Sequence, residues 1–207
     1  MLVKMNQKCI GQWTLFLIFS LFSLCLTPVV TGETKGGDSP LAVFKIAQVA
    51  GAKKDFSTLV KLVAPTEHPM MAFGTAMGLG MFVEFYEGEN AAELKKKFQE
   101  IEKKYAIKED DGKKLKITQD TPQEVIDEHM RKRAEKQYGH VDASKYVPDV
   151  MGIVLNLPEM ADQTFIPQEK LTDLKINENR ATGKAGKKKI SFIREGGRWY
   201  LTADIMN

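Results

Sequence analysis

Cysteine is nearly absent from this chain of 207 residues: there are two, and both lie within the first 32 residues. Residues 33–207 therefore have no thiol, which excludes a disulfide framework, a cysteine metal site and a cysteine nucleophile from that part. An excess of charge of one sign is also missing, because 30 Lys and Arg face 27 Asp and Glu. A net charge of +3 is too small to indicate a nucleic-acid partner.

The common motifs of catalysis and metal binding are missing as well. The three histidines, His68, His129 and His140, are scattered and lack the spacing of a zinc-protease helix. There is no glycine-rich phosphate loop and no Gly-x-Ser-x-Gly motif. We expect no metal and no cofactor, and we assign no catalytic residue. Glu84 and Asp204 border apolar segments and would become candidate bases only if they were buried.

The first 32 residues have the organisation of a signal peptide. Two lysines precede an uncharged apolar core over residues 13–26, and Val30 and Gly32 supply the small residues of a cleavage site. We predict cleavage near Gly32 and a secreted or periplasmic protein. The alternative is an N-terminal membrane anchor, because residues 9–30 carry no charge and approach the ~20 residues that span a bilayer. A membrane is an expected partner only in that case.

Helical periodicity dominates the chain from Ser39 onward. Ser39 before Pro40 is typical of a capped helix start, and Asp55 is expected to cap a second, short helix. Further amphipathic helices are expected over residues 90–105, 121–139 and 146–157. We expect Asn90 to cap the first of these and Pro148 to start the last.

Residues 69–83 are the most unusual segment, with fifteen residues and no charge. Gly74 and Gly78 lie four apart, on one face of a helix, where a neighbouring backbone or a ligand can come close. We predict a buried helix that packs against the sheet and forms whatever pocket exists. A pocket wall or partner-binding face is the second interpretation, and a membrane hairpin is the third.

The period changes from helical to alternating at residue 171. Strands are expected over residues 171–176, 180–185, 190–193 and 199–203. Gly196-Gly197 suits a tight hairpin, because glycine accepts positive φ. Helices first and an antiparallel meander last predict a helix-rich α+β fold, with N-terminal helices packed on a curved C-terminal sheet. We expect a linker over residues 33–38 and a single domain over residues 39–207.

The two ends of that domain carry distinctive local patterns. They are Ser39-Pro40, residues 52–56 (AKKDF), Val63-Ala64-Pro65, and the run from residues 179–183 (NRATG) through 190–192 to 195–201 (EGGRWYL). In these patterns the chain resembles small secreted members of the nuclear transport factor 2-like superfamily. The resemblance implies a cone in which a curved antiparallel sheet wraps around helices and leaves an apolar cavity between them. Residues 69–165 depart from the family pattern because they are longer and more helical. No catalytic residue carries over.

Two functions follow as expectations. The first is a non-catalytic binding or structural module with an apolar pocket for a small molecule or a protein partner, including a second copy as a homodimer. The residues expected to line that pocket are Phe73, Met77, Met81, Phe192, Trp199 and Leu201. The alternative is a cone-fold enzyme, an isomerase, dehydratase or hydrolase-like protein, with a buried carboxylate base. A cavity filled by Met and Phe would favour the first.

Overall fold

The computed structural model describes residues 36–108, 118, 121–157, 160 and 162–206, which lie in one compact unit beginning at Thr34. The predicted leader lies outside these residues. The helices are α2 (Pro40–Ala52), α3 (Phe56–Leu62), α4 (His68–Phe85), α5 (Ala91–Lys104), α6 (Gln123–Tyr138) and α7 (Ala143–Val154), with a 3₁₀ turn η1 (Pro65–Glu67). The strands are β1 (Leu171–Asn177), β2 (Arg180–Ala185), β3 (Lys188–Glu195) and β4 (Arg198–Leu201), followed by a 3₁₀ turn η3 (Ala203–Met206).

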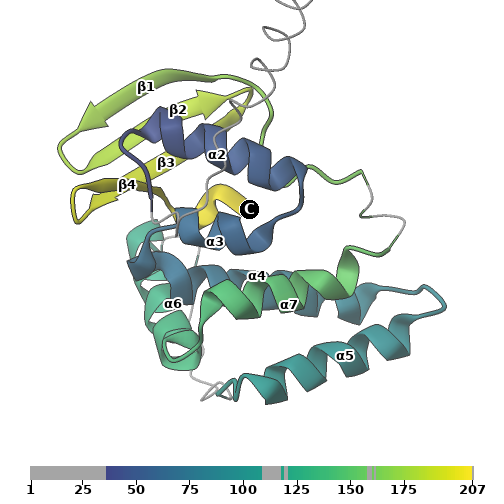
Figure 1. The fold of residues 1–207 in the computed structure, drawn as a ribbon. Coiled ribbons are helices and arrows are strands. Elements are labelled where there is room, and N and C mark those ends of the chain that lie inside the picture. Colours follow the sequence, from purple (N-terminus) through teal and green to yellow (C-terminus); the bar gives the residue numbers. More distant parts are fainter. Residues whose placement is uncertain (1–35, 109–117, 119–120, 158–159, 161, 207) are drawn as a thin grey trace, which may run out of the picture. The chain divides into compact units, whose positions relative to one another are not determined.

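The strands form an open antiparallel meander in the spatial order β1-β2-β3-β4 (Figure 1). Gly196 and Gly197 have φ values of +54° and +82°, as the predicted tight hairpin requires. The last strand ends at Leu201, and Ala203 starts η3 instead of continuing the strand as predicted. Helices precede this sheet and pack with it, so the prediction of a helix-rich α+β fold is confirmed.

Helix α2 packs on β4 at one face of the sheet (Figure 1). Its start agrees with the prediction, because Pro40 is the first helical residue and Ser39 Oγ accepts a hydrogen bond from Ala42 N at 3.2 Å. Trp199 is only 5% exposed and belongs to the same core cluster as the buried residues of α2. Its predicted burial between sheet and helices is therefore confirmed.

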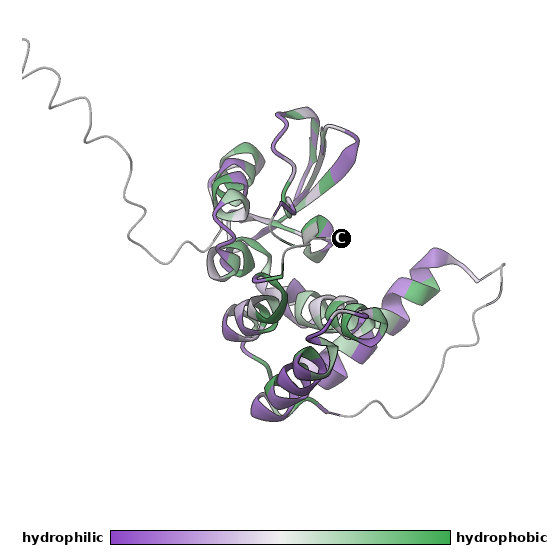
Figure 2. Cartoon of the chain, turned by 90° about the vertical axis from the view of Figure 1, so that its right-hand side faces the viewer, coloured by the Kyte–Doolittle hydropathy of each residue, from purple (hydrophilic) through white to green (hydrophobic). Residues whose placement is uncertain are grey.

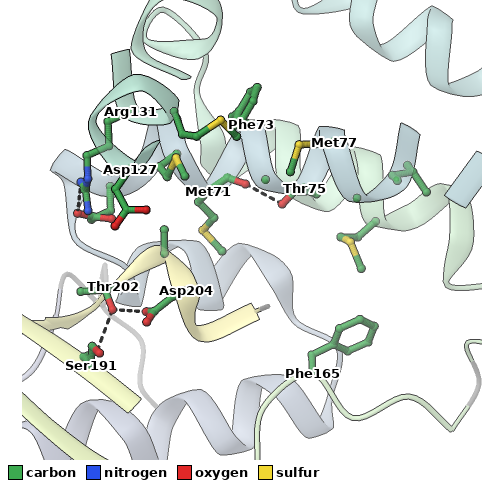
Figure 3. A pocket seen from close by; sticks show the side chains of 18 of the residues that line it. Met71, Phe73, Thr75, Met77, Asp127, Arg131, Phe165, Ser191, Thr202 and Asp204 are labelled. Carbon is green, nitrogen blue, oxygen red and sulfur yellow. Dashed lines mark hydrogen bonds and ion pairs between the residues drawn. The ribbon is translucent and has the colours of Figure 1, made fainter. Parts of the chain in front are cut away.

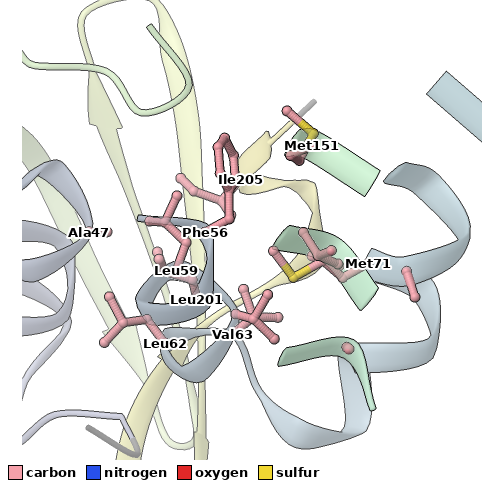
Figure 4. Packing of buried hydrophobic residues seen from close by; sticks show 14 of the residues in the cluster. Ala47, Phe56, Leu59, Leu62, Val63, Met71, Met151, Leu201 and Ile205 are labelled. Atoms are coloured by element: carbon pink, nitrogen blue, oxygen red, sulfur yellow. The ribbon is translucent and has the colours of Figure 1, made fainter. Parts of the chain in front are cut away.

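Helix α3 connects the sheet to the remaining helices. Asp55 caps it as predicted, by accepting a hydrogen bond from Thr58 N at 3.0 Å. Just after the helix, Ala64 N donates to the carbonyl oxygen of Leu201 at 3.0 Å, which fixes the end of α3 to β4. Figure 4 shows the buried side chains of α3 in one cluster with Leu201 and with Met71 of α4. We call α2, α3 and β1–β4 the sheet half, and α4–α7 the helical half.

Residues 69–83 are helical, as predicted, but they do not pack against the sheet. Helix α4 packs mainly on α6 and α7, with smaller contacts to α5 and η3. Helix α2 packs on the sheet at β4, and the residue Ala64, just after α3, is hydrogen-bonded to Leu201 of that strand. Only one side of α4 is buried, and Met81 and Phe85 on the other side are 58% and 77% exposed. No helix in the described part of the chain is long and apolar enough to cross a membrane.

The outer helices differ from the sequence prediction mainly at their starts. Helix α7 begins at Ala143, after Asp142, so Pro148 lies inside the helix and not at its start. Asn90 precedes α5 but its side chain makes no capping bond, and Glu93 instead pairs with Lys97 at 2.6 Å. Figure 2 shows that hydrophilic residues dominate α5 and α6, the outer members of the helical half.

Candidate functional site

An open cavity of about 740 Å³ runs along α4 (Figure 3), and we call it the α4 groove. Its lining comes from α4 and the turn before it, from α6 and α7, from the loop before β1, and from the sheet ends and η3. The contributing residues are Glu67, Met70, Met71, Phe73, Gly74, Thr75, Met77, Gly78, Leu79, Phe82, Asp127, Met130, Arg131, Met151, Val154, Met160, Phe165, Arg180, Ser191, Thr202, Ala203 and Asp204. The groove therefore lies where the two halves of the molecule meet.

Two glycines form an unusually bare stretch of α4 within the groove. A Cβ atom placed on Gly74 or on Gly78 would meet no atom within 4 Å. Glycine inside a helix destabilises it by roughly 1 kcal/mol relative to alanine, so two of them on one face carry a cost in stability. The space above them belongs to the groove, as the spacing in the sequence predicted for whatever pocket exists.

Methionine and phenylalanine dominate the apolar part of the lining. Six of the ten methionines of the chain line the groove, together with three phenylalanines: Met70, Met71, Met77, Met130, Met151, Met160, Phe73, Phe82 and Phe165. Methionine is unbranched and polarisable, so it adapts its shape to an apolar neighbour. A lining of this composition is apolar and deformable, which are the properties of a site that accepts flexible or variable ligands.

The end of the groove nearest the sheet is polar (Figure 3). Arg131 Nη1 on α6 donates to Glu67 Oε1 at 2.7 Å, and the Glu67 side chain is only 9% exposed. The Thr202 hydroxyl lies within hydrogen-bond distance of two acceptors, the carbonyl oxygen of Ser191 at 3.2 Å and the carboxylate of Asp204, and its single proton is shared between them. Charged and hydroxyl groups thus collect at one end of a groove that is otherwise apolar.

The carboxylates in and near the groove are each either paired or exposed. Glu67 is buried and forms an ion pair with Arg131. Asp127 is exposed and accepts a hydrogen bond from Gln123 Nε2 at 2.8 Å. Asp204 is exposed at the polar end, and Glu84 lies outside the groove in an exposed pair with Lys95 at 2.7 Å. Neither Glu84 nor Asp204 is buried, so neither meets the condition that was set for a candidate base.

A second polar cluster joins α5, α6 and α7 away from the groove. The ring of Tyr146 lies 5.2 Å from that of Tyr105 and 5.6 Å from that of Tyr138, and burial raises the pKa of Tyr146 far above its ordinary value. Burial also raises the pKa of Glu102. Asp149 accepts hydrogen bonds from Tyr105 Oη at 2.7 Å and from Lys104 Nζ at 2.6 Å. These contacts hold the three helices together; Tyr146 itself is fully buried.

The six predicted pocket residues are divided among three places. Phe73 and Met77 line the α4 groove. Met81 lies one turn further along α4, exposed and outside the groove. Phe192, Trp199 and Leu201 are buried in the core of the sheet half instead of facing the groove. That Phe73 and Met77 contact a ligand stays a prediction.

Sequence patterns did not predict the polar end of the groove, because its residues come from separate elements. Glu67 and Arg131 are 64 positions apart, and no local spacing connects them. One signal was available: Glu67 is the only acidic residue between Asp55 and Glu84. A lone acid within so apolar a stretch is a candidate for a buried, paired carboxylate.

Among the described residues, no three His, Cys, Asp or Glu side chains come together in a way that could hold a metal ion. Comparisons of the chain with protein-family models, with curated proteins and with solved structures find no match. The resemblance to the nuclear transport factor 2-like superfamily therefore stays a prediction.

Proposed function

We propose that this protein is a non-catalytic binding module that holds an elongated apolar or amphipathic molecule in the α4 groove. The observation that carries the proposal is the bare face of Gly74 and Gly78, which leaves room beside α4 where any other residue would fill it. The apolar part of the ligand would lie over these glycines, among the methionines. Its polar group would lie at the end formed by Glu67, Arg131 and Thr202.

The size and shape of the groove support a chain-like ligand. Sites for small molecules typically enclose about 300–1,000 Å³ and combine apolar walls with a few polar groups at fixed places, and the groove of about 740 Å³ has that composition. It follows α4 from Glu67 to Phe82, which is about 22 Å at about 1.5 Å of rise per residue. A length of this order suits an extended alkyl chain better than a compact ring system.

The same groove argues against the enzyme alternative. That alternative required a buried carboxylate free to act as a base, together with a tyrosine, in one pocket. Among the described residues that line the groove, Glu67 is the one buried carboxylate and it is paired with Arg131, and none of them is a tyrosine. We propose that this binding takes place outside the cytoplasm, because the first 32 residues have the composition of a signal peptide.

The test fills the bare face and measures binding of a dansyl-labelled fatty acid by its fluorescence. We expect Gly78→Leu to weaken binding of this probe about tenfold or more, because the new side chain occupies the space of the alkyl chain, while the unfolding midpoint does not fall. Gly152→Leu on α7 is the matched control: a Cβ there also meets nothing within 4 Å, but Gly152 does not line the groove. Undiminished binding by Gly78→Leu would refute the proposal.

A further inference from the structure

Beyond the groove, α4 exposes apolar side chains that no described residue covers. Phe85 is 77% exposed and is the most exposed large hydrophobic residue of the described chain, followed by Met81 at 58%. Gly74, Gly78, Met81 and Phe85 are spaced by four, three and four residues, so they share one face of the helix. The face thus has two bare positions in its first half and two protruding side chains in its second half.

We propose that a second copy of this chain covers this face, with the two α4 helices packed antiparallel. Placing Phe85 of one copy opposite Gly74 of the other puts Met81 opposite Gly78 in the same arrangement, because both pairs have their midpoint between Leu79 and Gly80. A single two-fold axis at this midpoint therefore produces both contacts, and each contact occurs twice, once from each copy. A symmetric interface requires self-complementarity of this kind, in which residue i of one copy contacts residue j of the other and residue j contacts residue i.

The chemistry of the face also favours a second copy. Residues 68–83 contain no Lys, Arg, Asp or Glu, so no like charges meet near the axis, where each helix faces its own equivalent. Small residues let helices approach closely, and antiparallel helices place opposite dipole ends side by side. An unrelated apolar partner could bind the exposed side chains, but its binding would not explain why the spacing of the two glycines matches the spacing of Met81 and Phe85.

This inference does not depend on the proposed ligand, although the two compete for space. Phe85 of the second copy would enter the groove above Gly74, where the alkyl chain is also placed. Ligand binding and dimerisation should then weaken each other by the same factor. The two proposals can fail separately, because Met81 and Phe85 do not line the groove.

The first experiment measures the oligomeric state by sedimentation equilibrium, on protein expressed from the full-length sequence. We expect a concentration-dependent dimer, and Phe85→Glu should raise its dissociation constant about tenfold or more. Val49→Glu is the matched control, because Val49 on α2 is a 56% exposed apolar residue far from the proposed axis, and it should leave the constant unchanged. A protein that is monomeric at about 1 mM, or a dimer indifferent to Phe85→Glu, overturns the proposal.

The second experiment tests the register by disulfide capture in a background with Cys9→Ser and Cys25→Ser, which leaves no other cysteine. Gly74→Cys and Phe85→Cys proteins are prepared separately and oxidised alone or mixed. Cross-linked dimer should form only when the two variants are mixed. In the proposed register, residue 74 of one copy is offset from residue 74 of the other by eleven residues along the helix axis, about 16 Å. That distance is beyond the reach of a disulfide. Equal cross-linking of either variant alone overturns the register. Probe binding retained by Phe85→Glu separates this result from the fate of the ligand proposal.

Discussion

Two pairs of glycines, one pair in each half of the molecule, have opposite surroundings. In the sheet half, a Cβ on Gly51 of α2 would come within 2.6 Å of Ile166, and one on Gly183 of β2 within 2.8 Å of Leu171. In the helical half, a Cβ on Gly74 or Gly78 would touch nothing within 4 Å. The first pair allows close packing, and the second keeps a space open. A side chain at the first pair would disturb the packing, whereas the second pair lowers the stability of α4 and leaves room beside it.

The largest effect should come from the packed core of the sheet half. We expect Trp199→Ala to lower the free energy of unfolding by ~3–5 kcal/mol, because it leaves a cavity in a close-packed core. Denaturant titration followed by circular dichroism measures the change. Ile176→Ala on the same sheet, where the side chain is 57% exposed, should cost much less. Equal costs for the two variants would show that the core is not where the sheet half is stabilised.

A substitution at Gly51 tests whether this glycine is needed for close packing. Gly51→Ala should destabilise the protein by ~1–3 kcal/mol, because its methyl group would overlap Cγ1 and Cβ of Ile166. Gly152→Ala is the control, since that helical glycine has open space around it. If Gly51→Ala were as stable as the control in the same denaturant titration, the packing of α2 on Ile166 would be looser than described.

The opposite sign is expected at the bare face of α4. Gly78→Ala should raise the free energy of unfolding by up to ~1 kcal/mol, because alanine favours the helix and the added methyl group meets no neighbour. Thermal unfolding should show the gain as a higher midpoint. A loss of stability would mean that the face is packed and that the groove is closed in solution.

The smallest effect concerns the ion pairs of the helical half. Hydrogen bonding from Lys104 lowers the pKa of Asp149 below its ordinary 3.8, so this carboxylate stabilises the fold above that pH and loses its contribution as pH falls through the lower, folded value. Because Lys104 is exposed and Asp149 is only half-buried, solvent screens the pair, and Asp149→Asn should cost only ~0.5 kcal/mol at neutral pH. Unfolding measured across pH should show the deficit vanish in acid; a deficit that persists there would contradict this account.

The sheet half was predictable because its signals are local. Ser39 and Asp55 act as caps within three residues, and Gly196-Gly197 fixes a hairpin by backbone conformation alone. The alternation of apolar and polar residues predicted the four antiparallel strands. It also predicted that the last strand continues to residue 203, which instead belongs to η3.

Helix α4 was predicted as a helix but misplaced, for a physical reason. Its residues are apolar on every side, so no periodic pattern distinguishes the buried face from the exposed one. Which face is covered depends on α6 and α7, elements that are distant in the sequence. The polar end of the groove depends in the same way on the meeting of Glu67 with Arg131, and only tertiary structure brings these two together.

The irregular edge strand β1 has a consequence for behaviour at high concentration. Its pairing with β2 slips between Thr172 and Lys175, where Asp173 has a φ of +52°. A strand of another molecule that paired with β1 would meet an irregular hydrogen-bonding edge with Lys175 beside the irregularity. Irregular pairing and charged side chains on an edge strand both oppose edge-to-edge association of sheets. A chain without disulfides in this part, and with Leu174 and Ile176 exposed on that strand, thereby has a barrier against stacking into fibrils.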